Sequence, residues 1–150
     1  MSSRSVGTTE AAYGLTHSCF ATSKAKGEWI VVGGIGAQSI RWAHVLSWKM
    51  AQKLWYQLAE YLFPEQMEQV MGIALRLAVP PQPKADETLI EMIDVAPLLD
   101  GNLIDIRAYL GQTTWRFRLG LHDAHFLWAA LDLALYPGGW QGDRPPELRL

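Results

Sequence analysis

The chain has 150 residues, of which 49% are hydrophobic and 19% charged; this excludes a disordered protein and favours one compact domain with a sizeable core. Its formal net charge of −2 argues against a protein that coats a polyanion. No apolar run approaches the roughly 18 residues of a membrane span, and the first residues lack the apolar segment of a signal peptide. The only cysteine, Cys19, cannot form an internal disulfide, so we expect a cytoplasmic protein.

The first half of the chain begins with a strand-rich region. Residues 1–10 are small and polar and predict a flexible arm. Two β-rich runs, at 13–22 and 28–32, are typical of a hairpin, and the glycines at positions 33, 34 and 36 are expected to end it. Apolar and polar residues then alternate over 40–46, which predicts a third strand.

A helix is expected directly after this third strand. Ser47 is suited to cap its first turn, and Pro64 is expected to end it near Phe63. Pro64 can also start a second short helix over 64–70. One face of the first helix is apolar with i, i+3 and i+4 spacing, through Ala51, Leu54, Trp55, Leu58 and Leu62.

The second half predicts four strands and another helix. Asp123 is the expected N-cap of that helix, which should run over about 124–136. A proline-rich loop is expected at 80–86. The four strands are predicted from alternation and β-rich composition at 73–79, 88–95, 103–110 and 115–119.

Two stretches of the sequence repeat at an offset of 73. Residues 42–64 align without a gap to residues 115–137, and random matching would give on the order of two identities over this length. The identical pairs are Trp42/Trp115, Leu46/Leu119, Ala51/Ala124, Leu54/Leu127, Trp55/Trp128, Leu58/Leu131, Leu62/Leu135 and Pro64/Pro137. These are also positions that a helix or strand would bury, so we interpret the chain as a duplicated unit.

The duplication predicts an α+β fold built from two βββ(β)α units. We expect a twisted antiparallel sheet with two equivalent helices packed on its core side. A single domain at 11–137 would contain repeats at about 11–64 and 71–137, followed by an extended tail at 138–150. A homodimer could bury the same helix faces with further copies.

Two consecutive units of strands followed by a helix resemble the Whirly and Pur-alpha class of single-stranded nucleic-acid-binding folds. The resemblance is topological and covers about residues 11–137. The Lys24-Ala25-Lys26-Gly27 segment is loosely similar to the Lys-Gly-Lys-Ala loop of plant Whirly proteins. It implies binding of single-stranded DNA or RNA as an alternative function.

Four patterns in the sequence are candidates for a catalytic, metal or phosphate site. The glycine-rich segment 34–39 is compared with a phosphate loop, and a connection between strands is favoured because a strand follows it. His122 and His125 could bind a metal, but exposed histidines beside the helix cap are favoured. His17 and Cys19 would share a strand face as a dyad, but a buried thiol is favoured. Asp105 and Glu91 could pair across strands, but solvated charges are favoured. We therefore expect no catalytic site, no metal and no cofactor.

The strongest candidate site is the sheet face opposite the helices. Alternation in two neighbouring strands directs three arginines and a tyrosine to that face, where guanidinium groups and an aromatic ring suit phosphates, bases or an acidic peptide. Trp140 in the tail is a further candidate contact. The predicted partner-binding residues are Arg107, Tyr109, Arg116, Arg118 and Trp140.

The sequence thus favours a non-enzymatic binding or assembly module. Seven tryptophans and a charge near neutral are typical of a protein that recognises another protein. The expected contact is a sheet face, a sheet edge or the C-terminal tail. Binding of single-stranded nucleic acid is kept as the alternative.

Overall fold

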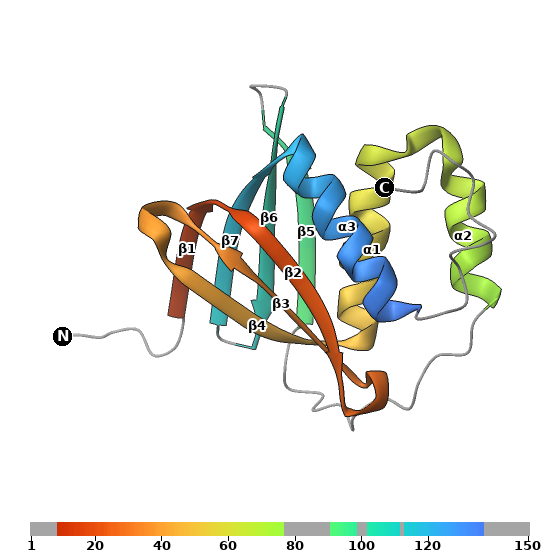
Figure 1. The fold of residues 1–150 in the computed structure, drawn as a ribbon, viewed down its shortest axis with the longest axis horizontal. Coiled ribbons are helices and arrows are strands. Elements are labelled where there is room, and N and C mark those ends of the chain that lie inside the picture. The colour runs from red at the N-terminus through yellow and green to blue at the C-terminus, as the bar shows by residue number, and fades with distance from the viewer. Residues whose placement is uncertain (1–8, 77–90, 99–101, 112, 137–150) are drawn as a thin grey trace.

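The computed structural model describes residues 9–76, 91–98, 102–111 and 113–136, and it has an α+β fold with two sheets and three α-helices in these ranges. The four-stranded sheet has the order β1 (Thr9–Leu15), β7 (Thr113–Gly120), β6 (Leu103–Leu110) and β5 (Glu91–Pro97). The three-stranded sheet has the order β2 (His17–Lys24), β3 (Trp29–Ile35) and β4 (Arg41–Ser47). Its strands run obliquely across those of the other sheet (Figure 1).

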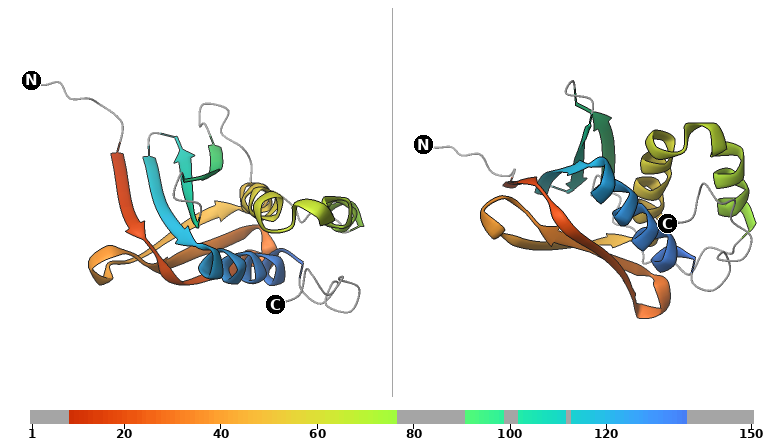
Figure 2. Two further views of the ribbon diagram at one scale, coloured as in Figure 1. Left: turned by 90° about the horizontal axis from the view of Figure 1, so that it is seen from above. Right: turned by 45° about the horizontal axis from the view of Figure 1, so that its top comes forward.

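The helices are α1 (Trp48–Leu62), α2 (Met67–Arg76) and α3 (Leu121–Leu135). Helices α1 and α3 lie side by side next to both sheets, and α2 lies on the far side of α1 (Figures 1 and 2). The predicted cap of α1 is confirmed, because the Ser47 hydroxyl accepts a hydrogen bond of 3.1 Å from the Met50 N–H. Among the described helices, none is both long and apolar enough to cross a membrane.

The chain passes from one sheet to the other at Thr16, between β1 and β2. Gly14 has a φ of 71°, and the Thr16 hydroxyl donates to its carbonyl oxygen at 3.1 Å. The Thr16 N–H donates to the Arg118 carbonyl oxygen at 2.8 Å, and Thr16 is fully buried. These bonds fix the crossing point, so both sheets are held in one structure.

The core lies between the helices and the two sheets. Trp55 and Trp128 are both fully buried, and their rings stack with centroids 6.1 Å apart, which confirms the expectation that both are core residues. The Trp55 indole donates to Asp132 Oδ1 at 3.0 Å across the two helices. Burial of a large apolar side chain stabilises the fold by roughly 1.5–3 kcal/mol before entropy. The buried side chains of α1 and α3 therefore hold the two helices together and against the sheets.

The expectation of one antiparallel sheet is corrected by the presence of two. Strands β2, β3 and β4 are antiparallel neighbours, as are β5, β6 and β7, but β1 pairs in parallel with β7. The chain is therefore divided at Thr16, where one continuous strand had been expected. Residues 9 and 10 belong to β1 rather than to the predicted arm, while residues 1–8 and the tail at 138–150 lie outside the described residues.

Three local predictions are also corrected. The strand expected at 73–79 is helical up to Arg76, where α2 ends, and 77–79 lie outside the described residues. Gly33 and Gly34 belong to β3 instead of ending it. Gly120 is the N-cap of α3, and Asp123 lies within its first turn. The carboxylate still suits that turn, because the helix N-terminus carries partial positive charge.

Candidate functional site

The outer face of the three-stranded sheet is apolar and open to solvent. Phe20 and Val45 are 40% and 46% exposed, although each is a large hydrophobic residue in a strand. Val31 lies opposite Val45, and Gly33 lies between Phe20 and Ala43. We define the apolar sheet face by the hydrophobic residues on this side, which Thr22 and Ser47 also share: Phe20, Trp29, Val31, Ile35, Ala43 and Val45. Contiguous exposed apolar surface of this kind marks interaction sites.

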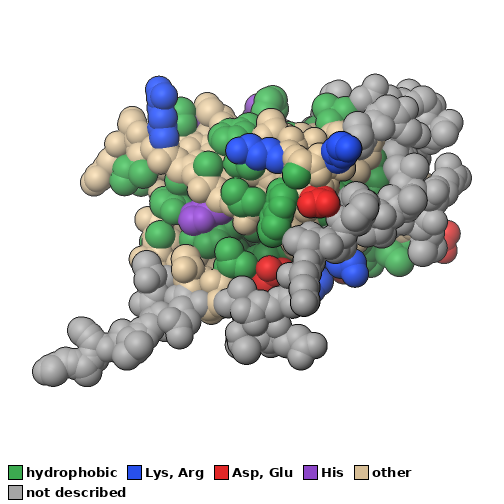
Figure 3. All heavy atoms as spheres, turned by 90° about the horizontal axis from the view of Figure 1, so that it is seen from below, with side chains coloured by type: hydrophobic (Ala, Val, Ile, Leu, Met, Phe, Trp, Pro, Cys, Tyr) green, Lys and Arg blue, Asp and Glu red, His purple; other side chains and the backbone are tan. Residues whose placement is uncertain are grey.

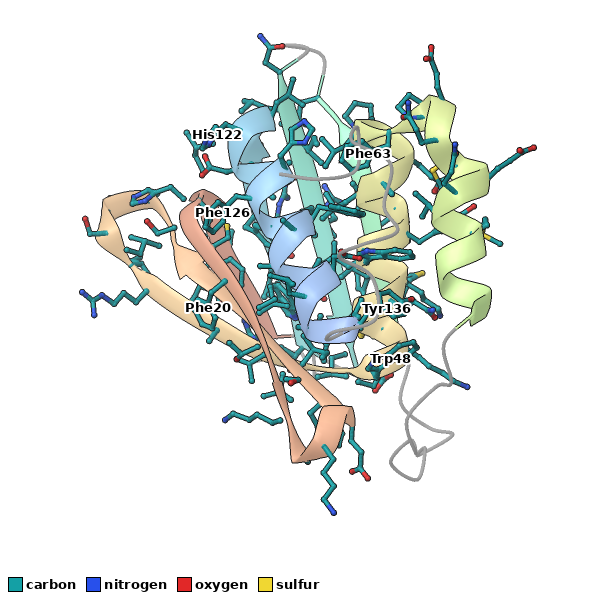
Figure 4. All side chains as sticks on the ribbon, turned by 45° about the vertical axis from the view of Figure 1, so that its right-hand side comes forward. Phe20, Trp48, Phe63, His122, Phe126 and Tyr136 are labelled. Carbon is teal, nitrogen blue, oxygen red and sulfur yellow. The ribbon has the colours of Figure 1, made fainter. Side chains whose placement is uncertain are left out.

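Gly33 allows the ring of Phe20 to lie over the sheet. A Cβ atom at Gly33 would lie 2.7 Å from two ring carbons of Phe20 and 2.4 Å from the Trp42 carbonyl oxygen. A side chain at this position would therefore displace the ring. A groove of about 450 Å³ lies beside Phe20, and Ile35, Arg41 and Ala43 help to line it. In Figure 4 Phe20 projects from β2 on the side of the molecule away from α2.

The charges on this face are of one sign. Lys24 lies opposite Trp29 at one end of the sheet, and Arg41 lies opposite Ile35 at the other. Both cations are exposed, and none of the strand positions that share this face is acidic. The face thus combines an apolar centre with positive charge at opposite ends.

The predicted arginine face lies on the outer side of the four-stranded sheet. Arg107 is opposite Arg116, and Tyr109 follows on the same side, so the expected grouping of these side chains is present. Arg118 lies opposite Asp105, whose carboxylate is 3.5–3.8 Å from the nitrogens of all three guanidinium groups. We call Arg107, Tyr109, Arg116 and Arg118 the arginine face. Trp140 lies outside the described residues.

Acidic side chains balance the arginine face. Asp105 is only 7% exposed and lies at its centre. Asp94 is opposite Arg107 on β5, and Glu10 is opposite Thr114 on β1, so both share the same side of the sheet. Tyr109, through a hydrogen bond, and then Asp105 raise the pKa of the Arg107 guanidinium. Three carboxylates therefore accompany three arginines.

An aromatic cluster fills the space between the two sheets. Tyr13 and Trp42 stack with centroids 4.8 Å apart, and His44 stacks on Trp115 at 4.2 Å. The Tyr13 hydroxyl and His44 Nε2 form a hydrogen bond of 2.7 Å, and burial lowers the pKa of His44. Seen from below, hydrophobic side chains cover much of the described surface (Figure 3). The cluster joins β1 and β7 to β4.

His17 and Cys19 lie on opposite sides of the backbone of β2. Ser18 has a φ of 52° and the β2 register shifts between His17 and Phe20, so His17 is exposed while Cys19 is buried. The expectation that these two share a strand face is therefore wrong. Burial, and then the charge of Asp123, raise the pKa of the Cys19 thiol to about 12, which disfavours the nucleophilic thiolate.

The remaining candidates have structural explanations. The ring of His125 packs edge-on against Phe63 with centroids 5.5 Å apart, whereas His122 points away from α1 (Figure 4). The described residues contain no group of three or more side chains placed to hold a metal ion. The glycine-rich segment leads through a single 3₁₀ turn, Ala37–Ser39, into β4, so no α-helix follows it to bind a phosphate.

The proposed pair of Asp105 and Glu91 is not formed. Asp105 lies opposite Ala96, while Glu91 lies opposite Leu110 at the other end of β5, and its carboxylate is 3.5 Å from the Ser47 hydroxyl. The structure instead assembles Asp105 with the three arginines.

The apolar sheet face was not predicted from the sequence. The signal was present over 28–32, where apolar residues occupy both sides of the predicted strand: Trp29 and Val31 on one, Ile30 and Val32 on the other. Ile30 and Val32 are fully buried, so the remaining pair must face outward. No known protein-family model matches the chain, and no curated protein is significantly similar to it in sequence.

Proposed function

We propose that this protein is a non-enzymatic binding module that receives another protein on the apolar sheet face. The observation that carries this proposal is the solvent exposure of Phe20 and Val45 on a strand face where polar residues are the rule. Aromatic and branched side chains in a shallow groove provide the anchoring contacts of protein interfaces. The buried thiol of Cys19 and its separation from His17 support a role without nucleophilic chemistry.

The charge pattern specifies the partner. Lys24 and Arg41 stand at opposite ends of the face without an acidic neighbour on it, so an apolar element flanked by carboxylates is complementary. The partner is therefore an acidic, amphipathic segment of another protein. A cytoplasmic location is part of this proposal, since the buried Cys19 needs no oxidising compartment.

The test compares matched lysine substitutions on the two sheets. Phe20→Lys places a charge in the apolar sheet face, whereas Met92→Lys makes the same change at an equally exposed position, 48%, beside the arginine face. We expect Phe20→Lys to weaken capture of a native partner at least about tenfold, a loss of about 1.4 kcal/mol, and Met92→Lys to leave it unchanged. Val45→Lys provides a second disruption if Phe20→Lys unfolds. Equal affinity in all variants, measured by calorimetry, would show that the apolar sheet face is not the binding site.

The arginine face supports the second candidate function, binding of single-stranded nucleic acid. Three guanidinium groups near Tyr109 suit phosphates and stacked bases. The three accompanying carboxylates weaken this candidate, because they reduce the local positive potential. Fluorescence anisotropy with an oligothymidine distinguishes the candidates. Salt-dependent binding that Arg116→Gln and Arg118→Gln reduce, with no effect of Phe20→Lys, favours nucleic acid.

We also infer that the chain arose by duplication of a βββα unit. At the offset of 73, α1 and α3 coincide in both bounds, and their N-caps are Ser47 and Gly120. Their C-caps, Phe63 and Tyr136, have nearly equal backbone angles, and each donates its N–H to the residue four positions earlier. Strands β2, β3 and β4 precede α1 as β5, β6 and β7 precede α3, whereas β1 and α2 lie outside this correspondence. These correspondences support equivalent helices.

A further inference from the structure

The edges of the two sheets are protected to different degrees. The side-chain amide of Gln57 on α1 donates to the Ile93 carbonyl oxygen and accepts from the Val95 N–H, both at 2.9 Å. One amide thus makes the two hydrogen bonds that a residue of a neighbouring strand would make to β5. Helix α3 packs against β2, and the turn at Ala37–Ser39 packs against β1. Within the described ranges, β4 has a strand on one side only, as does β1, where Glu10 and a register shift disfavour pairing with a further strand.

The alternation of hydrogen-bonded and non-bonded pairs between β3 and β4 identifies the backbone N–H and C=O groups at the open edge of β4. The Trp48 N–H donates to the Glu28 carbonyl oxygen, and the Gly36 N–H donates to that of Ile40, so both of these β3–β4 pairs are hydrogen-bonded. Antiparallel pairs alternate between bonded and non-bonded types. The residues of β4 in the non-bonded pairs therefore direct their N–H and C=O groups away from β3: Arg41, Ala43 and Val45, with Ser47 at the end of the strand where α1 begins.

Strand β4 lacks the features that normally prevent edge pairing. Its sequence, RWAHVLS, has no proline, lysine or acidic residue, and its pairing with β3 has no register shift. Exposed edges without charge, proline or a bulge readily pair with another strand. Arg41 is the single fixed charge, and it stands at the first position of the strand.

We propose that β4 pairs antiparallel with β4 of a second copy of this chain. With Ala43 opposite itself, Arg41 lies opposite Val45, so the pairing brings no like charges together and matches all outward N–H groups of these three residues with carbonyl oxygens. The pairing joins two three-stranded sheets into one. It also joins two apolar sheet faces, although it requires no other partner.

The interaction is expected to be weak and dependent on concentration, because one strand pair buries less than the roughly 1,200 Å² of a stable interface. Sedimentation velocity of the full chain over about a hundredfold range of concentration should show a monomer–dimer equilibrium. Hydrogen exchange at the backbone amides of Arg41, Ala43 and Val45 should slow as concentration rises. The amides of Trp42 and His44, which bond to β3, should be protected at every concentration.

A proline substitution tests the backbone of the β4 edge, and Phe20→Lys serves as the control for the apolar sheet face. Ala43→Pro removes one outward N–H without removing a bond to β3, and Ala43→Ser retains the N–H at the same site. We expect Ala43→Pro to raise the dissociation constant at least about tenfold, and Ala43→Ser and Phe20→Lys to leave it nearly unchanged. If Ala43→Pro fails to fold, Val45→Pro serves the same purpose.

Two results would overturn the proposal. One is a monomer at all concentrations with rapid exchange at the three amides, which means that the edge stays open. The other is a monomer in which these amides are protected, which means that another part of the same chain covers β4. Neither result bears on the apolar sheet face, because Phe20 is on β2 and its test uses a different partner.

Discussion

The outer faces of the two sheets differ in how they meet solvent. The four-stranded sheet presents arginines whose charges converge on Asp105. The three-stranded sheet presents Phe20 and Val45 with little polar cover. Both sheets bury their other face in the same core, so the difference lies in the alternate residues alone. The charges of the arginine face are therefore partly compensated by a carboxylate of the same face, whereas the hydrophobic side chains of the apolar sheet face remain exposed to solvent.

The largest expected effect comes from the core that both sheets share. Trp55→Ala and Trp128→Ala should each lower the free energy of unfolding by about 3–5 kcal/mol, because each removes a fully buried indole and leaves a cavity. Chemical denaturation followed by circular dichroism measures both. If one variant lost much stability and the other almost none, the two sheets would not depend on one common core.

Gly33→Ala should lower the free energy of unfolding by about 1–3 kcal/mol, because the new methyl group would clash with the Trp42 carbonyl oxygen. Gly72→Ala is the matched control in α2: a Cβ there meets nothing within 4 Å. That control should gain about 0.5–1 kcal/mol from reduced chain entropy. Thermal unfolding compares the two, and a neutral Gly33→Ala would show that the ring of Phe20 does not depend on the glycine.

Asp105→Asn should cost about 1–2 kcal/mol, because it removes the charge shared by three arginines that are themselves 30–47% exposed in their side chains. Asp94→Asn alters an exposed carboxylate of the same face and should change stability by less than about 0.5 kcal/mol. Denaturant titration at low and high salt measures both. Equal losses in the two variants would mean that Asp105 does not organise the arginine face.

The smallest effect on stability is expected at His44, in the aromatic cluster between the two sheets. Burial lowers the pKa of His44, so its folded form favours the neutral imidazole. The stabilising contribution is present above the ordinary pKa of about 6.5 and is lost as the pH falls from there toward the lowered value. His44→Asn should therefore lose less thermal stability than the natural chain between about pH 7.5 and about pH 5.5. Parallel pH profiles would show that other groups, such as His125, account for the dependence.

Sequence periodicity identified the helices and the central strands because these positions are set locally. Ser47 and the strand at 103–110 are examples in which cap chemistry or alternation suffices. The segment predicted as a strand at 73–79 has a pattern that suits either a strand or a helix, and its described part, 73–76, continues α2 from Val70.

Non-local pairing explains most of what the sequence did not predict. The division into two sheets depends on bonds from Thr16 to Gly14 and Arg118, and the parallel contact of β1 with β7 joins distant parts of the chain. The arginine grouping could be predicted because a short turn sets the register of β6 and β7. The position of Asp94 opposite Arg107 could not be predicted without the pairing of β5 with β6.

The amide of Gln57 closes the outer edge of β5 to a further strand. A subunit with one open sheet edge can form a closed pair, after which growth stops. A subunit with two open edges can continue to add copies and form a filament. By occupying the Ile93 and Val95 backbone groups, one glutamine side chain would separate finite assembly from open-ended polymerisation. Its loss would therefore favour the addition of further copies at β5.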